Sequence, residues 1–191
     1  MTAPARVVVA TKTTSRTAER VDDDLSRFTR ELGTDVLDLV LLHCITAKDW
    51  PASRAGAMEA LSRAKERGMV RAVGVSCHSL EALRTAAETD WVDAVLVRTN
   101  HAGKSMDGSP PEVVPIVQRL YRAGIGVYAM KVYAVGKLAD DARRAIEYVL
   151  SLGTVHSLNI GSTSQAQLLQ NISLMEELAP SHPLSRPGAA R

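Results

Sequence analysis

The chain has 191 residues, 46% hydrophobic and 23% charged, and its 23 basic and 21 acidic residues leave a net charge of +2. This is globular composition with enough length for one sizeable core, and without a basic stripe interleaved with aromatics we expect no nucleic-acid partner. No apolar stretch approaches the roughly 18 residues that span a membrane, and the run 7–10 is too short for a signal peptide. Two cysteines, Cys44 and Cys77, are too few for a disulfide framework, so we expect a cytoplasmic protein with free thiols.

One pattern repeats along the chain: a short apolar run, expected to form a strand, is followed by a segment expected to form a helix. In chain order, strand and helix are expected at 6–11 and 17–32, 36–43 and 55–68, 70–76 and 79–88, 92–100 and 112–123, 125–131 and 140–152, and 155–161 and 164–178. Glycines stop the helices, as Gly33 and Gly68 do after the first two. We expect a single domain over 1–179 and a disordered tail over 180–191, which is rich in Pro, Gly and Ser.

The alternation of strands and helices predicts parallel strands joined by right-handed crossovers. Nearly continuous apolar strands are typical of a sheet that is covered on both faces. Two architectures fit this pattern: a doubly wound open sheet, and part of a (β/α)₈ barrel.

Polar or reactive residues stand at the carboxyl ends of the predicted strands. Five ends carry Lys12, His43, Ser76, Asn100 and Lys131, and the sixth is followed by the sequence GST. Each has an ordinary explanation, since a lysine often only reaches solvent and a histidine after a buried run is often structural. Ligands bind at this edge in both architectures, and the row of such residues therefore predicts a site.

The segment GSTSQAQLLQN, residues 161–171, places a glycine and three hydroxyl residues just before a helix. Free backbone N–H groups and the helix dipole favour a phosphate at such a place. The alternative is an N-cap formed by Ser162 or Ser164.

The residues at the strand ends also suit two other kinds of chemistry. A zinc site would need ligands from a set of histidines and cysteines near the strand ends: His43, Cys44, Cys77, His78 and His101. Adjacent residues of a strand point to opposite faces, so we expect no metal there. A Schiff base on one of the strand-end lysines is the other possibility, and no acid–base partner for it is evident.

Three segments resemble the aldo-keto reductases: ATK at 10–12, LGTDVLDLVLLH at 32–43 and ERGMVRAVGVS at 66–76. Residues 161–171 resemble the closing cofactor segment of that family. The resemblance implies an α/β protein, a partial TIM-type (β/α)₈ barrel whose six parallel βα units correspond to strands 3–8. It also implies a bacterial oxidoreductase that transfers hydride between NADP (or NAD) and a small carbonyl or alcohol substrate.

The active site of this family combines an aspartate, a tyrosine, a lysine and a histidine. By position Lys12 matches the lysine, which with the aspartate lowers the pKa of the tyrosine, and His43 matches the histidine, which orients the carbonyl. Ser76 matches the serine that contacts the nicotinamide carboxamide. The matches to the segment that holds the 2′-phosphate, ribose and adenine are Gly161, Thr163, Gln167, Gln170 and Asn171.

The sequence also departs from the family. The family's aspartate and tyrosine precede the lysine strand, and neither residue type occurs before Lys12 here. We therefore expect a fragment of a longer gene product or a truncated paralogue, inactive alone, that self-associates through its unpaired sheet edges. The alternative is a non-catalytic remnant that binds a nucleotide or a partner. Gln167 stands where some members carry an arginine for the 2′-phosphate, so both NADP and NAD remain possible. Tyr133 is a candidate for the aromatic residue that stacks on nicotinamide.

Overall fold

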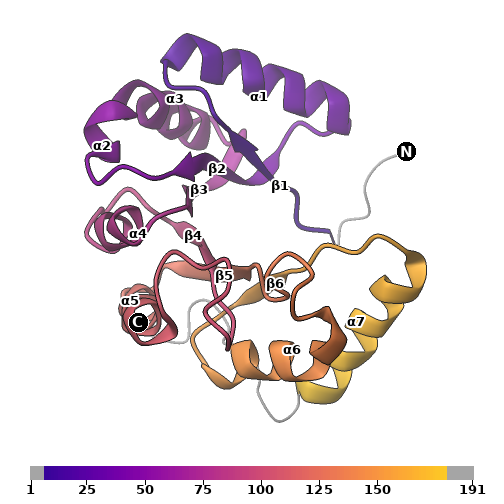
Figure 1. The fold of residues 1–191 in the computed structure, drawn as a ribbon. Helices are drawn as coiled ribbons and strands as arrows, with labels where there is room; N and C mark the ends of the chain where they lie inside the picture. Colours follow the sequence, from indigo (N-terminus) through magenta and orange to yellow (C-terminus); the bar gives the residue numbers. More distant parts are fainter. Residues whose placement is uncertain (1–6, 180–191) are drawn as a thin grey trace. The chain divides into compact units, whose positions relative to one another are not determined.

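The computed structural model describes residues 7–179. The chain forms two compact units, Met1–Val95 and Leu96–Arg191, and the division falls within strand β4 (Ala94–Arg98). Six strands alternate with helices along the chain, in the predicted order (Figure 1). No helix within residues 7–179 is long and apolar enough to cross a membrane.

The first unit contains a parallel sheet in which β2 pairs with both β1 and β3. Its elements are β1 (Ala10–Thr13), α1 (Ala18–Leu32), β2 (Leu37–Ile45), α2 (Trp50–Ser53), α3 (Ala55–Glu66), β3 (Val70–Cys77) and α4 (Leu80–Ala86). In register, Lys12 of β1 lies opposite Leu41 of β2, which lies opposite Gly74 of β3. The strand ends named in the sequence are thus aligned in space within this unit.

Helices α1 and α3 pack against each other through apolar faces that the sequence spacing creates. In α1 the buried residues Val21, Leu25 and Phe28 recur at intervals of four and three, which places them on one face. The face of α3 is made largely of alanines, so the two helices can approach closely. Gly33 ends α1 with a φ of 63°, the left-handed conformation that glycine adopts without strain.

Gly74 allows β3 to lie against the chain that follows α4. A Cβ atom at this position would lie 1.9 Å from the carbonyl oxygen of Ala94. Next to it, the backbone N–H of Asp93 donates to the carbonyl of Val73 at 2.9 Å, and the Asp93 carboxylate accepts from the Val73 N–H at 2.9 Å. Only a residue without a side chain fits here.

The second unit contains the parallel pair β5–β6, in which Tyr128 lies opposite Ser157. After β4 its elements are α5 (Pro110–Arg122), β5 (Gly126–Met130), the short 3₁₀ helix η1 (Ala139–Asp141), α6 (Ala142–Ser151), β6 (Ser157–Asn159) and α7 (Gln165–Leu178). Helix α6 packs against α7. Of the residues in α7, only Leu178 is buried, whereas Leu168, Leu169 and Ile172 are exposed.

The structure differs from the sequence prediction in several places. The first strand covers Ala10–Thr13 rather than 6–11, and Val7 and Val8 are 56% and 73% exposed. The last strand covers Ser157–Asn159 rather than 155–161, and the four-residue helix α2 was not predicted. The predicted tail, 180–191, lies outside the described residues, and the single domain over 1–179 stays a prediction.

Candidate active site

Lys12 and His43 lie on neighbouring parallel strands of the first unit. Since Lys12 pairs with Leu41, His43 stands two residues further along β2. Burial and the positive charge of Lys12 lower the pKa of His43 below its ordinary value. The imidazole is therefore neutral at pH 7, with one N–H donor and one acceptor nitrogen. The positive charge of Lys12 thus acts on the ring of His43 from the neighbouring strand.

A β-bulge shapes the end of β2 at His43. Leu42 pairs with Val75 and Ile45 pairs with Cys77, so β2 has one more residue than β3 over this stretch. Cys44 absorbs the extra residue with a φ of 57°, which is uncommon for a residue other than glycine. The alternation of side chains that a regular strand shows is therefore broken at this position.

Ser76 and His78 form the neighbouring part of the site. The Ser76 side chain is fully buried, and its Oγ lies 3.2 Å from Nε2 of His78. The ring of His78 meets that of His43 edge to face, with centroids 5.5 Å apart and planes at 89°. From the sequence, His78 was a candidate only for a zinc site. Within residues 7–179, no three His, Cys, Asp or Glu side chains gather closely enough to hold a metal ion.

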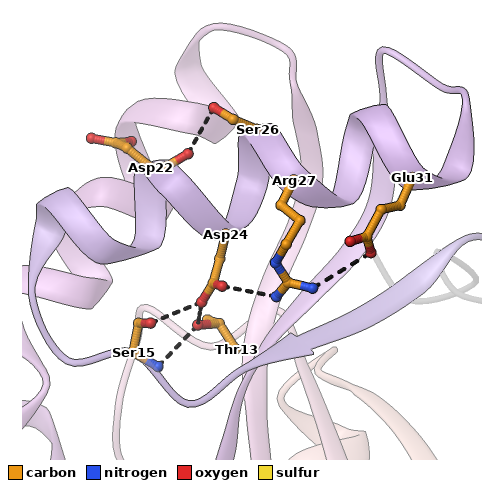
Figure 2. A network of polar contacts seen from close by, with 7 residues as sticks. All are labelled: Thr13, Ser15, Asp22, Asp24, Ser26, Arg27 and Glu31. Carbon is orange, nitrogen blue, oxygen red and sulfur yellow. Dashed lines mark hydrogen bonds and ion pairs between the residues drawn. The ribbon is translucent and has the colours of Figure 1, made fainter.

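A polar network fixes the loop that follows Lys12 (Figure 2). The hydroxyls of Thr13 and Ser15 donate to Oδ2 of Asp24 at 2.6 and 2.8 Å, and Arg27 donates to Oδ1 at 2.9 Å. Burial opposes ionisation of Asp24, but these hydrogen bonds outweigh it and lower the pKa of the carboxyl. The loop after β1 is thus anchored to α1 by an ionised side chain.

Asn100, two residues beyond the end of β4 in the second unit, has a structural role. Its Nδ2 donates to the carbonyls of Lys104 and Lys131 at 2.8 and 3.1 Å. Its Oδ1 accepts from the N–H groups of Ala102 and Lys104 at 3.1 and 3.2 Å. The buried amide therefore uses both donor hydrogens and both acceptor positions to hold its loop, and it offers nothing to a ligand.

The segment 161–171 forms an exposed turn at the start of α7. Ser164 caps the helix, since its Oγ accepts from the N–H of Gln167 at 3.2 Å. Oε1 of Gln167 accepts in turn from the N–H and Oγ1 of Thr163 at 2.8 and 3.0 Å. Gly161 and Gln170 are exposed. The N-cap by Ser164 is therefore confirmed, and the phosphate site stays a prediction.

Asn171 connects this turn to the loop after β5. Its Oδ1 accepts from the Tyr133 hydroxyl at 2.6 Å, and its Nδ2 donates to Oγ of Ser162 at 3.1 Å. An open pocket of about 330 Å³ lies beside it, lined by Ser162 and Asn171 and by the apolar residues Leu158, Ile160, Leu168, Ile172 and Met175. Tyr133 and Asn171, which lie 38 residues apart, thus meet at the start of α7.

The predicted site residues therefore fall into two groups. Lys12, His43 and Ser76 lie together in the first unit, and the five residues matched to the closing segment lie together in the second, at 161–171. The contacts of His78 and the structural role of Asn100 were not predicted from the sequence. The signal for His78 was its place two residues after Ser76.

Comparison with known proteins gives the family. The model of the Aldo/keto reductase family matches residues 1–185. A curated relative, D-threo-aldose 1-dehydrogenase of a Pseudomonas species, is 22% identical to this chain over an alignment of 190 residues. The alignment covers 81% of this chain and 56% of that protein. The chain thus spans little more than half the length of this relative.

Two solved structures share the fold. An aldo-keto reductase-like protein from Pseudomonas aeruginosa has a TM-score of 0.77 at 20% identity, covering 92% of this chain and 67% of its own. An aldo/keto reductase from Klebsiella pneumoniae, solved with NADP and acetate, has a TM-score of 0.66 at 19% identity, covering 95% of this chain and 72% of its own. These matches confirm the predicted fold class, six parallel βα units of a partial TIM-type barrel. The chain belongs to the aldo/keto reductase family.

Proposed function

We propose that the chain binds NADP(H) and carries part of the site at which aldo-keto reductases transfer hydride to a small carbonyl substrate. The observation that carries this proposal is the position of Lys12 and His43 on neighbouring parallel strands, where His43 stands two residues beyond the register partner of Lys12. A neutral imidazole can donate a hydrogen bond to a carbonyl oxygen, and a nearby ammonium stabilises the negative charge that develops there. The reduced nicotinamide, when bound, supplies the hydride.

The residues at the start of α7 fit a dinucleotide. Gly161 leaves open space, since a Cβ there would meet no atom within 4 Å, and the hydroxyls of Ser162 and Thr163 are exposed. These groups, with the helix dipole, suit a phosphate. No Lys or Arg occurs in 161–179, so the donor set is neutral. We therefore expect NADPH and NADH to bind with affinities within about tenfold of each other, since no cation is provided for the 2′-phosphate.

Turnover also requires a proton donor. Neither Asp nor Tyr occurs before Lys12. In the second unit burial raises the pKa of Tyr128 to about 12, and it also raises the pKa of Tyr133, whose hydroxyl is bonded to Asn171. Neither phenol is tuned for proton transfer near neutral pH. A positioned acid contributes roughly 10²–10⁴-fold, so we expect the 191-residue chain alone to reduce carbonyls very slowly.

The test is isothermal titration of the full chain with NADPH and with NADH, followed by an assay of NADPH oxidation with a small aldehyde. Saturable binding with little turnover is the expected result, and it also fits the second candidate function, non-catalytic nucleotide binding. The Lys12→Met variant separates the two, because the residual aldehyde reduction falls only if Lys12 serves the reaction. If neither dinucleotide binds, the proposed function is wrong.

A further inference from the structure

Arg54, the single residue between α2 and α3, is a buried cation. It is only 9% exposed, and within residues 7–179 it forms no ion pair with a carboxylate. Its Nη1 donates instead to the backbone carbonyls of Thr14 and Ser15, at 2.8 and 3.3 Å, and so holds the loop after β1. Charged groups that are this well buried are normally paired with a group of opposite charge.

The other two nitrogens of the Arg54 guanidinium are available to a ligand. Nε and Nη2 make no hydrogen bond within the described part of the chain, and neither is completely shielded from solvent. Their N–H groups form an edge that matches the two oxygens of a carboxylate or phosphate group. Because the side chain is buried and Nη1 is bonded, this edge is held in place before any ligand arrives.

The surroundings of Arg54 favour a negatively charged ligand. Burial and the positive charge of Arg16 lower the pKa of Arg54, and the thiol of Cys44 acts in the opposite direction. Helix α3 begins directly after Arg54, and helix α1 begins two residues after Arg16. A Cβ atom on Gly56 would lie 3.4 Å from the Arg16 carbonyl oxygen, so the two helix starts are close together. Their positive dipole ends add to the charge of the two arginines.

The carboxylate that anchors this loop is already engaged by other groups. Oδ2 of Asp24 accepts from the hydroxyls of Thr13 and Ser15, and Oδ1 accepts from Arg27 (Figure 2). Both oxygens thus serve the loop and helix α1. A ligand can therefore supply the counter-ion of Arg54.

We propose that Arg54 and Arg16 bind the carboxylate group of an acidic carbonyl substrate, an oxo acid. This inference rests on the proposed function above and names its substrate class. Both arginines follow the strands that carry Lys12 and His43. Arg54 is bonded to the carbonyl two residues beyond Lys12, and its charge interacts with the thiol that follows His43. An oxo acid offers a carbonyl for Lys12 and His43 and a carboxylate for the two arginines.

The test follows the Nε–H signal of Arg54 and the backbone amides at the two helix starts by NMR. The ¹⁵N-labelled full chain is titrated with 4-hydroxybutanoate, with 1-butanol and with inorganic phosphate. The first two are alcohol products of equal carbon number that differ by the carboxylate. We expect 4-hydroxybutanoate to shift these signals and to bind at least about tenfold more tightly than 1-butanol, the effect of a charge-assisted pair. Equal affinities would overturn the proposal, and so would shifts with phosphate alone, which would show a site for free phosphate.

Variants separate ligand binding from a purely structural role. Arg16→Gln should weaken the binding of 4-hydroxybutanoate about threefold, because it removes an exposed positive charge beside the site. Arg20→Gln, a change to an exposed arginine in the first turn of α1, is the matched control and should bind as the wild type does. Arg54→Lys keeps the charge but not the two-nitrogen edge, and should weaken binding about tenfold.

Circular dichroism checks that each variant is folded, and the exposed Arg16 decides the matter if Arg54→Lys is not. Equal binding by Arg16→Gln and Arg20→Gln would show that these arginines are not the site. The titrations contain no dinucleotide, so the two proposals are tested separately. A chain that binds NADPH but does not prefer 4-hydroxybutanoate overturns this inference alone, whereas a chain that binds neither dinucleotide overturns the proposed function.

Discussion

Replacing Asn100 by alanine should destabilise the second unit, because the amide holds its loop with four side-chain hydrogen bonds. At about 1 kcal/mol net for each bond, the loss would be about 4 kcal/mol. Ala102 and Lys104 are exposed, so their freed backbone groups can reach water and the loss shrinks. We expect Asn100→Ala to lower the free energy of unfolding by about 2–3 kcal/mol. Asn159→Ala, a change to an exposed asparagine at the end of β6, should alter it by less than about 0.5 kcal/mol.

The assay is urea unfolding, and the aromatic residues allow each unit to be followed separately. Both tryptophans, Trp50 and Trp91, lie in the first unit, and the four tyrosines lie in the second. The shift for Asn100→Ala should therefore appear in the tyrosine near-ultraviolet signal. Asn100→Asp should also destabilise at pH 7, because its carboxylate faces two carbonyls, and should recover on acidification as protonation restores a donor. If Asn100→Ala unfolds at the same urea concentration as the wild type, the structural role assigned to Asn100 is wrong.

Three further results are expected. Gly74→Ala should lower the free energy of unfolding by more than about 3 kcal/mol or prevent folding, because its Cβ would lie 1.9 Å from the Ala94 carbonyl oxygen. Gly124→Ala, with open space but a φ of 78°, should lower it by only about 1–2 kcal/mol. Similar urea midpoints for the two variants would refute this. Lys12→Met should raise the pKa of His43 in an NMR titration, and an unchanged titration curve would mean that Lys12 does not act on the ring. The free energy of unfolding of the wild type should fall as the pH falls below about 6.5, because His43 then binds a proton more readily in the unfolded chain than in the folded one. Sedimentation velocity should show self-association promoted by the exposed Leu168, Leu169 and Ile172, and a monomer at all concentrations would contradict it.

The sequence was sufficient for the order of the six strands and for the placement of Lys12 and His43 on neighbouring strands. Both follow from periodicity, because parallel strands of known length bring their carboxyl ends to one edge. The exact extent of the first strand was not predictable, since Val7 and Val8 are as apolar as a strand requires but remain exposed. Hydrophobicity alone does not show which residues of an apolar run pair with a neighbouring strand.

The details of the site could not be predicted from the sequence, because they depend on how separate elements pack together. A β-bulge needs only one extra residue in a strand. Neither His43 nor Cys44 is a residue type that favours the left-handed conformation strongly enough to predict which of them adopts it. The burial of Ser76 and the contacts of His78 depend on the packing of the β3–α4 turn against the end of β2. Asn100 is a polar residue at a strand end like the others, and only its four partners show that it serves the loop.

Dinucleotide binding is tested most directly by mapping the backbone amide signals that shift when the ¹⁵N-labelled full chain, of 20.6 kDa, is saturated with NADP⁺. We expect shifts that cluster at 161–171 and around Lys12, His43 and Ser76, and much smaller shifts along the outer face of α1. Shifts that avoid both clusters, or no shifts at all, would contradict the claim that this chain binds the dinucleotide through the residues named here.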